Sequence, residues 1–335
     1  MKRWQLNEPS GLDALALTDA VLPTLKAKDV RIQVAATAVN YRDYSSLLDP
    51  VARQIPLPFT PNSDCAGIVT DTGSDVSLVK PGDRVASCFF QQWLDGPCST
   101  DIMRSALGGP LPGVLATDIV LTETGCIKIP DYLSLVDAAT LPCAALTAWN
   151  ALVTIGQLKA GDTVLLLGTG GVSMFALQLA VTLGINTIMT SSSDDKLSVA
   201  KQFGATHLLN YRTHPDWHRH VLEITNGMGV DLTLETGGAG TLPQSMEATR
   251  VSGCIVLIGI LTAGEINPVA LMRKSIRLQG LYVGSRQQFG DMLSHFAEHR
   301  IQPIVDSVVP FEQAPLAYHK LATATHVGKI VIGIE

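Results

Sequence analysis

The chain has 335 residues, which is enough for two ordinary domains. Hydrophobic residues make up 46% and charged residues 16%, a balance typical of a globular protein with a well-buried core. The net charge of −6 argues against a protein that binds phosphate backbones, which requires a basic surface, so we expect no nucleic-acid partner.

The first part of the chain is predicted to consist of short β-strands joined by turns. Residues 30–37 alternate apolar and polar side chains, as a half-buried strand does. Lys80-Pro81-Gly82-Asp83 predicts a turn, and residues 88–113 are rich in Gly and Pro and predict a long loop. Strands are expected at 30–37, 68–70, 84–87, 120–121 and 127–129.

The middle of the chain changes to alternating strands and helices. Residues 137–152 predict a helix that is interrupted at Pro142. The alternation that follows indicates a parallel sheet with helices on both faces. Strands are expected at 163–167, 187–190, 207–210, 231–235, 254–258 and 276–283, and helices at 172–183, 195–203, 216–225 and 241–249. A last helix is expected at 291–298, and strands at 307–310 and 329–332.

A glycine-rich turn follows the strand TVLLL and opens an apolar helix. Gly168 permits the tight bend, and Gly170 lets the backbone approach a pyrophosphate, which the N–H groups of the helix N-terminus then bind. The third position of the usual pattern holds Ser173, which is small enough for close packing. We therefore predict that the loop binds a dinucleotide; the alternative is a glycine-rich turn in another doubly wound fold. The predicted contacts are Gly168, Gly170, Gly171 and Val172.

The residues after the second strand of this region favour NADP(H) over NAD(H). An NAD site places an acid there, whereas this chain has Ser191 and Ser192. Lys196 lies in the first turn of the next helix, where the helix dipole disfavours a cation unless an anion such as a 2′-phosphate compensates. The alternative is that Lys196 is a solvated surface residue and Asp194 holds the ribose.

No targeting or membrane segment is expected. The N-terminal MKRWQLNEPSG lacks the apolar core of a secretory signal, and the apolar run at 255–261 is far too short to cross a bilayer. The six cysteines include no CxxC pair, which is typical of reduced, packed thiols. We therefore expect a cytoplasmic protein with no membrane partner.

Several motifs in one order resemble the medium-chain dehydrogenase/reductases. Within this superfamily the chain is most similar to the zinc-independent quinone oxidoreductase branch and to relatives described as zinc-type alcohol dehydrogenase-like. The motifs are Asn40-Tyr41-Arg42-Asp43, Pro61-Asn62-Ser63-Asp64 with Gly67, Lys80–Val85, Leu146–Trp149, Lys159–Asp162, the glycine-rich turn, Leu209-Asn210-Tyr211 and Gly328–Val331.

The resemblance implies an α/β fold in two domains. A doubly wound Rossmann domain that binds NADP(H), residues 126–284, is inserted into a GroES-like, mostly β catalytic domain formed by residues 1–125 and 285–335. The active site is expected in the cleft between them. The last Rossmann strand, near 276–283, is expected to pair two copies into a homodimer.

The resemblance also argues against zinc. The positions that carry the three catalytic zinc ligands in the zinc-dependent branch are matched by Asn40, Ser63 and a residue near Cys143, and one thiol cannot hold the metal. The four-cysteine lobe of a structural zinc site is also missing. Two histidine pairs spaced four apart, His214/His218 and His295/His299, are interpreted as solvated helix faces, although His295–His299 matches an inverted zincin pattern.

Without a metal, hydrogen bonds must stabilise the charge that hydride transfer creates. A quinone or an α,β-unsaturated carbonyl spreads that charge, so such acceptors are favoured over simple ketones. We predict that Tyr41 is a proton donor, that Asn40 contacts substrate and cofactor, and that Asp43 orients its neighbours or the nicotinamide ribose. Arg42 is expected to pair with Asp43. The alternative is a purely structural turn under the cofactor.

The remaining site residues come from the resemblance. Thr147 and the loop after the fifth strand are expected near the nicotinamide, and Tyr211 near the adenine end. For Thr147 the alternative is a hydroxyl bonded to its own helix, and for Tyr211 ordinary packing. Tyr41, Leu261 and the aromatic segment Phe89–Trp93 are expected to shape the substrate site, unless the aromatic residues only anchor their loop. The additional predicted cofactor contacts are Thr147, Tyr211, Gly259, Ile260, Leu261, Ser285 and Arg286.

The favoured function is therefore an NADPH-dependent reductase of a small-molecule quinone or enone. The alternatives are a zinc-free, NADP-linked alcohol or aldehyde dehydrogenase, and a non-catalytic NADPH-binding protein.

Overall fold

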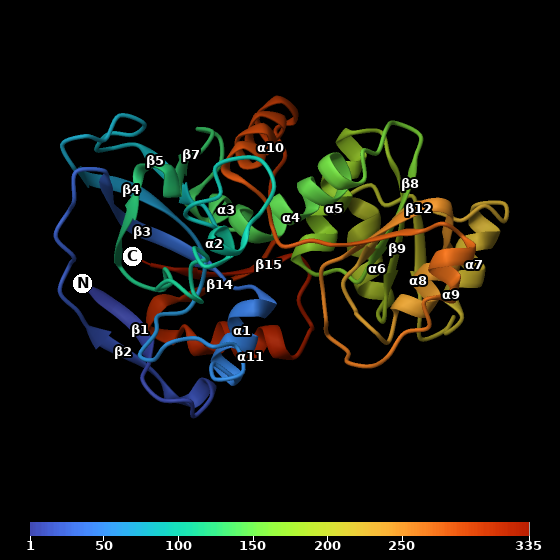
Figure 1. Cartoon of the computed structure of the whole chain (residues 1–335), viewed down its shortest axis with the longest axis horizontal. Coiled ribbons are helices and arrows are strands. Elements are labelled where there is room, and N and C mark those ends of the chain that lie inside the picture. Colours follow the sequence, from blue (N-terminus) through green and yellow to red (C-terminus); the bar gives the residue numbers. More distant parts are fainter. Residues whose placement is uncertain (335) are drawn as a thin grey trace. The chain divides into compact units, whose positions relative to one another are not determined.

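A computed structural model describes residues 1–334 of the chain. The chain forms two compact units, which are described separately (Figure 1). Unit 1 comprises Met1–Leu146 together with the segment from Val283 onward, and unit 2 comprises Thr147–Tyr282. The last strand, β15 (Lys329–Gly333), pairs antiparallel with β3 (Asp29–Ala38), and this pairing joins the two ends of the chain in unit 1.

Unit 1 is built around a seven-stranded sheet with the order β14-β15-β3-β4-β5-β7, in which β6 also pairs with β3. Along β3, Val30, Ile32 and Val34 are buried while Gln33 is exposed, so the predicted alternation does select the inner face. A separate hairpin joins β1 (Lys2–Leu6) and β2 (Leu15–Asp19). The other strands are β4 (Asp64–Thr72), β5 (Arg84–Ser87), β6 (Asp118–Thr122), β7 (Cys126–Lys128) and β14 (Val305–Pro310).

The helices of unit 1 are mostly short. The one that matters most for the site is α1 (Tyr41–Leu48), which starts directly after β3, and Asn40 is its N-cap residue. The region expected to be an interrupted helix is helical and interrupted near Pro142. α3 (Leu135–Ala138) is followed, after two turn residues, by a π-helix (Leu141–Ala145) with Pro142 in its first turn, and the helical segments then continue to Ile155. The other helices are α2 (Thr100–Met103), α3 (Leu135–Ala138), α10 (Arg286–His299), α11 (Pro315–Ala322) and the 3₁₀ turns Leu12–Ala14, Glu123–Gly125 and Phe311–Gln313.

Unit 2 contains a six-stranded, fully parallel sheet with the order β10-β9-β8-β11-β12-β13. In chain order this is 3-2-1-4-5-6, the arrangement of a Rossmann fold. Its strands are β8 (Thr163–Leu167), β9 (Asn186–Ser191), β10 (His207–Asn210), β11 (Val230–Glu235), β12 (Thr249–Leu257) and β13 (Arg277–Gly280). Its helices are α4 (Leu146–Trp149), a π-helix (Asn150–Ile155), α5 (Gly171–Thr182), α6 (Asp194–Gln202), α7 (Trp217–Ile224), α8 (Leu242–Ala248) and α9 (Val269–Arg273).

The predicted fold class is confirmed. β5, β8 and β10 have the bounds expected from the sequence, because each is a short run of strand-forming residues between clear turn residues. The sequence pattern did not indicate β1, β2, α1, α9 or α11. In α1 the sequence YRDYSSLL is short and mostly polar, with Tyr44 and Leu47 as the apolar side chains that pack on the core, so the sequence pattern gave little helical signal. Among the described residues, no helix is both long and apolar enough to cross a membrane.

Candidate functional site

The glycine-rich loop of unit 2 has the geometry of a phosphate-binding turn. Gly168 follows β8 with φ of +75°, a left-handed conformation that suits glycine. A Cβ on Gly170, the N-cap residue of α5, would meet no atom within 4 Å, so open space lies beside the backbone there. Ser173 occupies the third position because its hydroxyl donates to the Leu167 carbonyl, 2.7 Å away, and ties the helix to the strand. The unpaired N–H groups of the first turn of α5 can bind an anion at this point.

The predicted 2′-phosphate residues lie together at the end of β9. Ser191 is its last residue, and the Tyr211 N–H donates to the Ser191 carbonyl across 3.0 Å, which brings Tyr211 to the same corner. Lys196 lies in the first turn of α6, as expected. Asp194, the alternative ribose ligand, accepts a hydrogen bond of 2.8 Å from the Asn210 side-chain amide. This bond occupies one oxygen of the Asp194 carboxylate.

Glu235 organises the neighbouring loop, and we did not predict it. Its buried carboxylate ends β11 and accepts hydrogen bonds from the N–H groups of Gly237 at 2.7 Å and Gly238 at 3.0 Å. It also accepts bonds from the hydroxyls of Thr241 and Ser245. The available sequence signal was an acid at the end of a buried strand followed by two glycines. Glu235 therefore shapes the loop rather than serving as an exposed ligand.

The loop after β12 lies directly against the loop after β11. A Cβ on Gly259 would come within 1.8 Å of the Thr236 carbonyl oxygen, so only glycine fits there. The next residues, Ile260 and Leu261, are 72% and 54% exposed and free to meet a ligand. The loops after β8, β11 and β12 thus share the carboxyl edge of the sheet, where dinucleotides bind in such folds.

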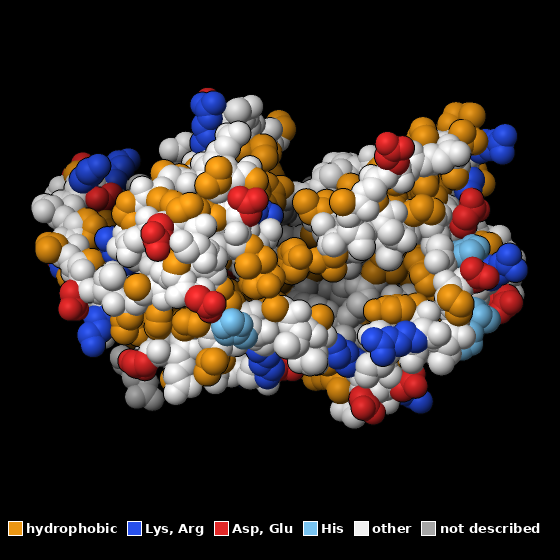
Figure 2. Space-filling view, turned by 90° about the horizontal axis from the view of Figure 1, so that it is seen from below, with side chains coloured by type: hydrophobic (Ala, Val, Ile, Leu, Met, Phe, Trp, Pro, Cys, Tyr) orange, Lys and Arg blue, Asp and Glu red, His pale blue; other side chains and the backbone are white. Residues whose placement is uncertain are grey.

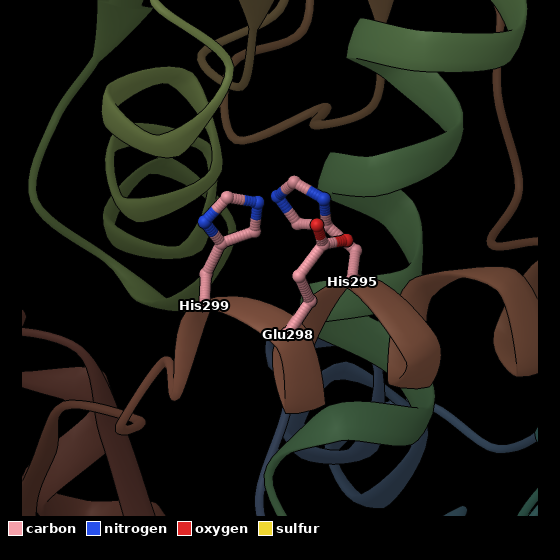
Figure 3. Close-up of side chains that lie close together, drawn as sticks. All are labelled: His295, Glu298 and His299. Atoms are coloured by element: carbon pink, nitrogen blue, oxygen red, sulfur yellow. The ribbon is translucent and has the colours of Figure 1, made fainter.

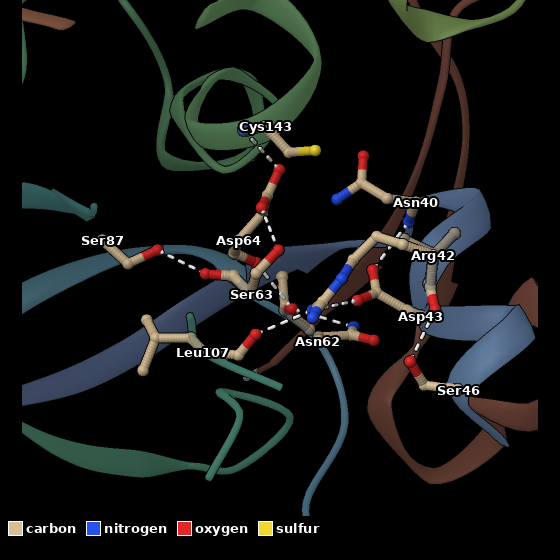
Figure 4. A network of polar contacts seen from close by, with 12 residues as sticks. Asn40, Arg42, Asp43, Ser46, Asn62, Ser63, Asp64, Ser87, Leu107 and Cys143 are labelled. Carbon is tan, nitrogen blue, oxygen red and sulfur yellow. Dashed lines mark hydrogen bonds and ion pairs between the residues drawn. The ribbon is translucent and has the colours of Figure 1, made fainter. Parts of the chain in front are cut away.

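Unit 1 contains a buried polar network around Asn40, Asp43 and Asp64 (Figure 4). The Asp43 carboxylate accepts a bond of 2.9 Å from the Asn40 N–H and pairs with the Arg42 guanidinium at 3.0 Å. Arg42 also donates to the Leu107 carbonyl at 2.7 Å and lies over the Phe89 ring. The expected pairing of Arg42 with Asp43 is present. Asp43 holds the start of α1 in place, which agrees with an orienting role.

Asp64 is the second buried carboxylate of the network. It accepts a bond of 2.5 Å from the Ser63 hydroxyl and one of 3.0 Å from the Cys143 N–H. Burial raises the pKa of Asp64 to about 6, and the nearby Asp43 adds to this, while the Lys329 ammonium opposes the increase. Burial also raises the pKa of Asp43, against the lowering effect of Arg42.

Tyr41 does not belong to this network. It is the first residue of α1, is 48% exposed, and its ring makes an edge contact with Tyr44, with centroids 6.1 Å apart. Of the three predicted catalytic residues, unit 1 therefore brings Asn40 and Asp43 together in a buried cluster and leaves Tyr41 on the surface beside them.

The residues at the positions expected for catalytic zinc do not fit the metal. Of the three positions, Cys143 alone carries a side chain that zinc commonly binds, and one thiol cannot hold the metal. The Ser63 hydroxyl is engaged as a donor to Asp64. The Asn40 side-chain oxygen already accepts a bond of 2.5 Å from the Lys329 ammonium, a cation at the very ligand position. These residues suit hydrogen bonding rather than metal coordination.

One other group of possible metal ligands lies on α10 (Figure 3). His295, Glu298 and His299 project from one helical face, with ligand atoms all within 4.8 Å of one another. Burial lowers the pKa of His295, while Glu298 and His299 are exposed. Glu298 and His299 lie on a solvated helix face, as expected, whereas His295 is half-buried, and the trio is not part of the Asn40–Asp64 network.

The other histidine pair is arranged differently from the prediction. His214 precedes α7, so it does not share a helix with His218. The His214 ring contacts His220, with centroids 4.3 Å apart, and the His218 ring bonds the Gln244 side chain. Figure 2 shows histidines among acidic and basic side chains at this end of unit 2. The segment before α7 is a turn because Pro215 interrupts the helical pattern.

Several remaining site predictions fall on residues with evident structural partners. Phe89, Phe90 and Trp93 are buried against one another, which favours the interpretation that they anchor their loop. Ser285 belongs to unit 1, where it caps α10 through Gln288, and the Arg286 N–H donates to the Trp93 carbonyl. Thr147 is buried in α4 of unit 2.

Comparisons with known proteins agree with this architecture. Residues 26–131 match the alcohol dehydrogenase GroES-like domain, and residues 171–298 match the zinc-binding dehydrogenase family. A zinc-type alcohol dehydrogenase-like protein of Schizosaccharomyces pombe is 39% identical, over 98% of both chains. A putative alcohol dehydrogenase from Sinorhizobium meliloti superimposes with a TM-score of 0.90 at 36% identity, over 99% of both chains.

Other solved structures differ in the coenzyme that their descriptions name. An NAD-dependent alcohol dehydrogenase is 29% identical with a TM-score of 0.92, over 100% of both chains. A mycobacterial protein in complex with NADPH is 25% identical with a TM-score of 0.84, over 99% of this chain and 100% of the other. The quinone oxidoreductase of Coxiella burnetii is 26% identical with a TM-score of 0.81, over 100% and 99%. The chain belongs to the medium-chain dehydrogenase/reductase superfamily of oxidoreductases.

The raised pKa of Asp64 predicts a specific pH dependence of stability. Between the ordinary pKa of 3.8 and about 6, the folded state binds more protons than the unfolded state, so Asp64 makes folding less favourable as the pH rises through this window. Asp64→Asn removes this titration. From about pH 4 to about pH 8, the free energy of unfolding of Asp64→Asn, relative to that of the native protein, is expected to rise by up to about 3 kcal/mol.

Urea unfolding at a series of pH values measures this difference. Asp95→Asn, at an exposed loop position, is the matched control, because solvent screens a charge there. A difference between Asp64→Asn and the native protein that stays constant across the range would contradict the prediction.

Proposed function

We propose that the protein transfers hydride from NADPH to a quinone or an α,β-unsaturated carbonyl compound without zinc. The observation that carries the proposal is the Asn40–Asp43–Asp64 network, which offers hydrogen-bond donors and a buried ammonium where a metal site would need ligands. Such a site stabilises the delocalised charge of an enolate or phenolate, whereas an alkoxide requires a stronger electrophile.

The coenzyme preference rests on the corner beside Ser191. Ser191, Ser192 and Lys196 offer hydroxyls and an ammonium suited to a 2′-phosphate, and Asp194 is engaged by Asn210. A charge-assisted hydrogen bond to a phosphate contributes about 1.5–3 kcal/mol, which corresponds to a preference of roughly ten- to a hundredfold. Similarity to known structures does not establish the coenzyme preference, because their descriptions name NAD in one case and NADPH in another.

The residues of this chain have separate tasks in the proposed reaction. NADPH, when bound, supplies the hydride. Asn40 donates a hydrogen bond toward the acceptor oxygen, and Asp43 keeps Asn40 in place through its N–H. Tyr41, at the exposed start of α1, is the candidate proton donor for the reduced product. Gly259, Ile260 and Leu261 would hold the nicotinamide.

A second candidate is an alcohol or aldehyde dehydrogenase that acts without zinc. Its support is the similarity to proteins described as alcohol dehydrogenases. The two candidates differ in whether the acceptor must be conjugated.

We also propose that two copies associate through β13. This strand is the edge of the parallel sheet, and its residues are largely exposed. An unpaired edge strand is a template for pairing with a second copy.

Gly170→Ala tests the nucleotide loop. The added Cβ meets no protein atom within 4 Å, so folding is preserved, but it fills the space through which a pyrophosphate approaches. Calorimetric titration is expected to show an NADPH Kd at least about tenfold higher, with little change in Tm. Gly290→Ala is the matched control, since its Cβ meets only Ile127, at 3.8 Å. Unchanged NADPH affinity in Gly170→Ala would exclude phosphate binding at this loop.

A matched pair of acceptors tests the reaction. NADPH oxidation is expected to be much faster with 2-cyclohexenone than with cyclohexanone, because only the first spreads the developing charge over a conjugated system. Prior treatment with a chelator is expected to leave the rate unchanged. Faster reduction of simple ketones or aldehydes would favour the second candidate, and a rate restored only by added zinc would contradict the metal-free site. NADPH binding with no turnover on either class would indicate a non-catalytic protein.

Gly280→Pro tests the proposed dimer. The Leu281 N–H bonds to β12, so by alternation the Gly280 N–H points outward, where a second copy would accept it. Loss of this donor is expected to shift the protein toward monomer in light-scattering measurements. Gly280→Ala keeps the N–H and serves as the control. Equal masses for both variants and the native protein would argue against pairing through β13.

A further inference from the structure

Lys329 is an ammonium group buried inside unit 1. Its side chain is 3% exposed, and lysine is almost never buried without partners. Its Nζ donates to the Val39 carbonyl at 2.7 Å and to the Asn40 side-chain oxygen at 2.5 Å. The strand register explains the contact: Val331 lies opposite Ala38, which places Lys329 opposite Asn40, where β3 passes into α1.

Lys329 also balances the charge of the network. Asp43 and Asp64 are both fully buried carboxylates, and Arg42 pairs directly with only the first of them. Lys329 is the cation that acts electrostatically on both carboxylates. Two buried negative charges are thus matched by two positive ones, which is the condition for keeping them inside a domain.

The ammonium determines how the Asn40 amide is oriented. Lysine can only donate, so the oxygen of the Asn40 amide must face it, and the NH₂ group must face the opposite side. Figure 4 shows this nitrogen directed toward the region between Cys143 and Asp64. The nitrogen is buried and makes no hydrogen bond of ordinary length with any described residue, although it lies close enough to the Asp64 carboxylate to lower the pKa of that group. A buried donor that is held by a charged anchor and makes no short hydrogen bond can donate to a ligand oxygen.

We propose that Lys329 is a positioning residue for the reaction: it locks the Asn40 amide so that Nδ2 donates to the carbonyl oxygen of the substrate. The proposal rests on the proposed function. In this arrangement the Lys329 ammonium polarises the Asn40 amide, and the amide donates to the substrate oxygen. In zinc-dependent enzymes a metal ion stabilises that oxygen directly. The arrangement also explains why the residues at this place do not fit zinc.

A double-mutant cycle on the full-length protein tests the proposal, with 2-cyclohexenone and NADPH as substrates. Lys329→Met and Asn40→Ala are each expected to lower kcat by about 10²-fold, as the loss of an oxyanion donor does. If Lys329 acts through Asn40, adding Lys329→Met to Asn40→Ala lowers kcat no further. The Kd of NADPH is expected to stay within about threefold of the native value in all variants.

Two further variants separate positioning from mere support of the fold. Lys329→Arg keeps the charge and the donor groups and is expected to recover part of kcat. The double variant Asn40→Asp/Asp64→Asn keeps an acceptor for Lys329 and the number of buried carboxylates but lacks the NH₂ donor at position 40, so it is expected to fold and yet to be as slow as Asn40→Ala. If Lys329→Met does not fold, the cycle is repeated on an Asp64→Asn background, which removes one buried charge of each sign.

The possible outcomes separate the two proposals. One outcome is that the native protein reduces 2-cyclohexenone while the losses of kcat from Lys329→Met and Asn40→Ala add in the double variant. That result, or a normal kcat in Lys329→Met, overturns the role of Lys329 and leaves the proposed function standing. An absence of enone reduction by the native protein, despite NADPH binding, overturns both.

Discussion

The pairing of β15 with β3 is the constraint on which the polar centre of unit 1 depends. It carries a lysine from near the C-terminus to the point where β3 ends and α1 begins. Without that cation, two buried carboxylates would face each other with only Arg42 to compensate, and charges in such surroundings require partners. The pairing therefore joins the ends of the chain and also makes the Asn40–Asp43–Asp64 network possible.

In unit 2 the candidate binding edge depends on how closely its loops pack, rather than on buried charges. Its binding edge is formed by loops rather than by charged side chains: an open turn at Gly168–Gly170, and a close contact at Gly259 that admits no Cβ. Glu235 holds the intervening loop from inside, since its carboxylate accepts several bonds from that loop. A rigid, N–H-lined edge suits a ligand that is recognised mainly through its phosphates.

Much of the site was predictable from particular residues, and the rest was not. The glycine turn was recognisable because strand, turn and helix follow one another in the chain, so local spacing carries the information. Asp43 and Arg42 are neighbours, and their pairing follows from proximity. Glu235 and Lys329 were missed because their partners come from other loops and strands. The exposure of Tyr41 could not be predicted from the sequence either, because it depends on how α1 packs against the rest of unit 1.

The sequence alone determined the fold class and most elements of unit 2: the alternation of strands and helices, the parallel sheet and the phosphate-binding turn. These features arise from interactions within a few residues, and hydrophobic periodicity records them directly. Only the tertiary structure decided which charges meet in the interior. Lys329 and Asn40 are separated by most of the chain, and their contact exists because a strand register aligns them. Burial then makes that contact strong, because little water remains to screen it.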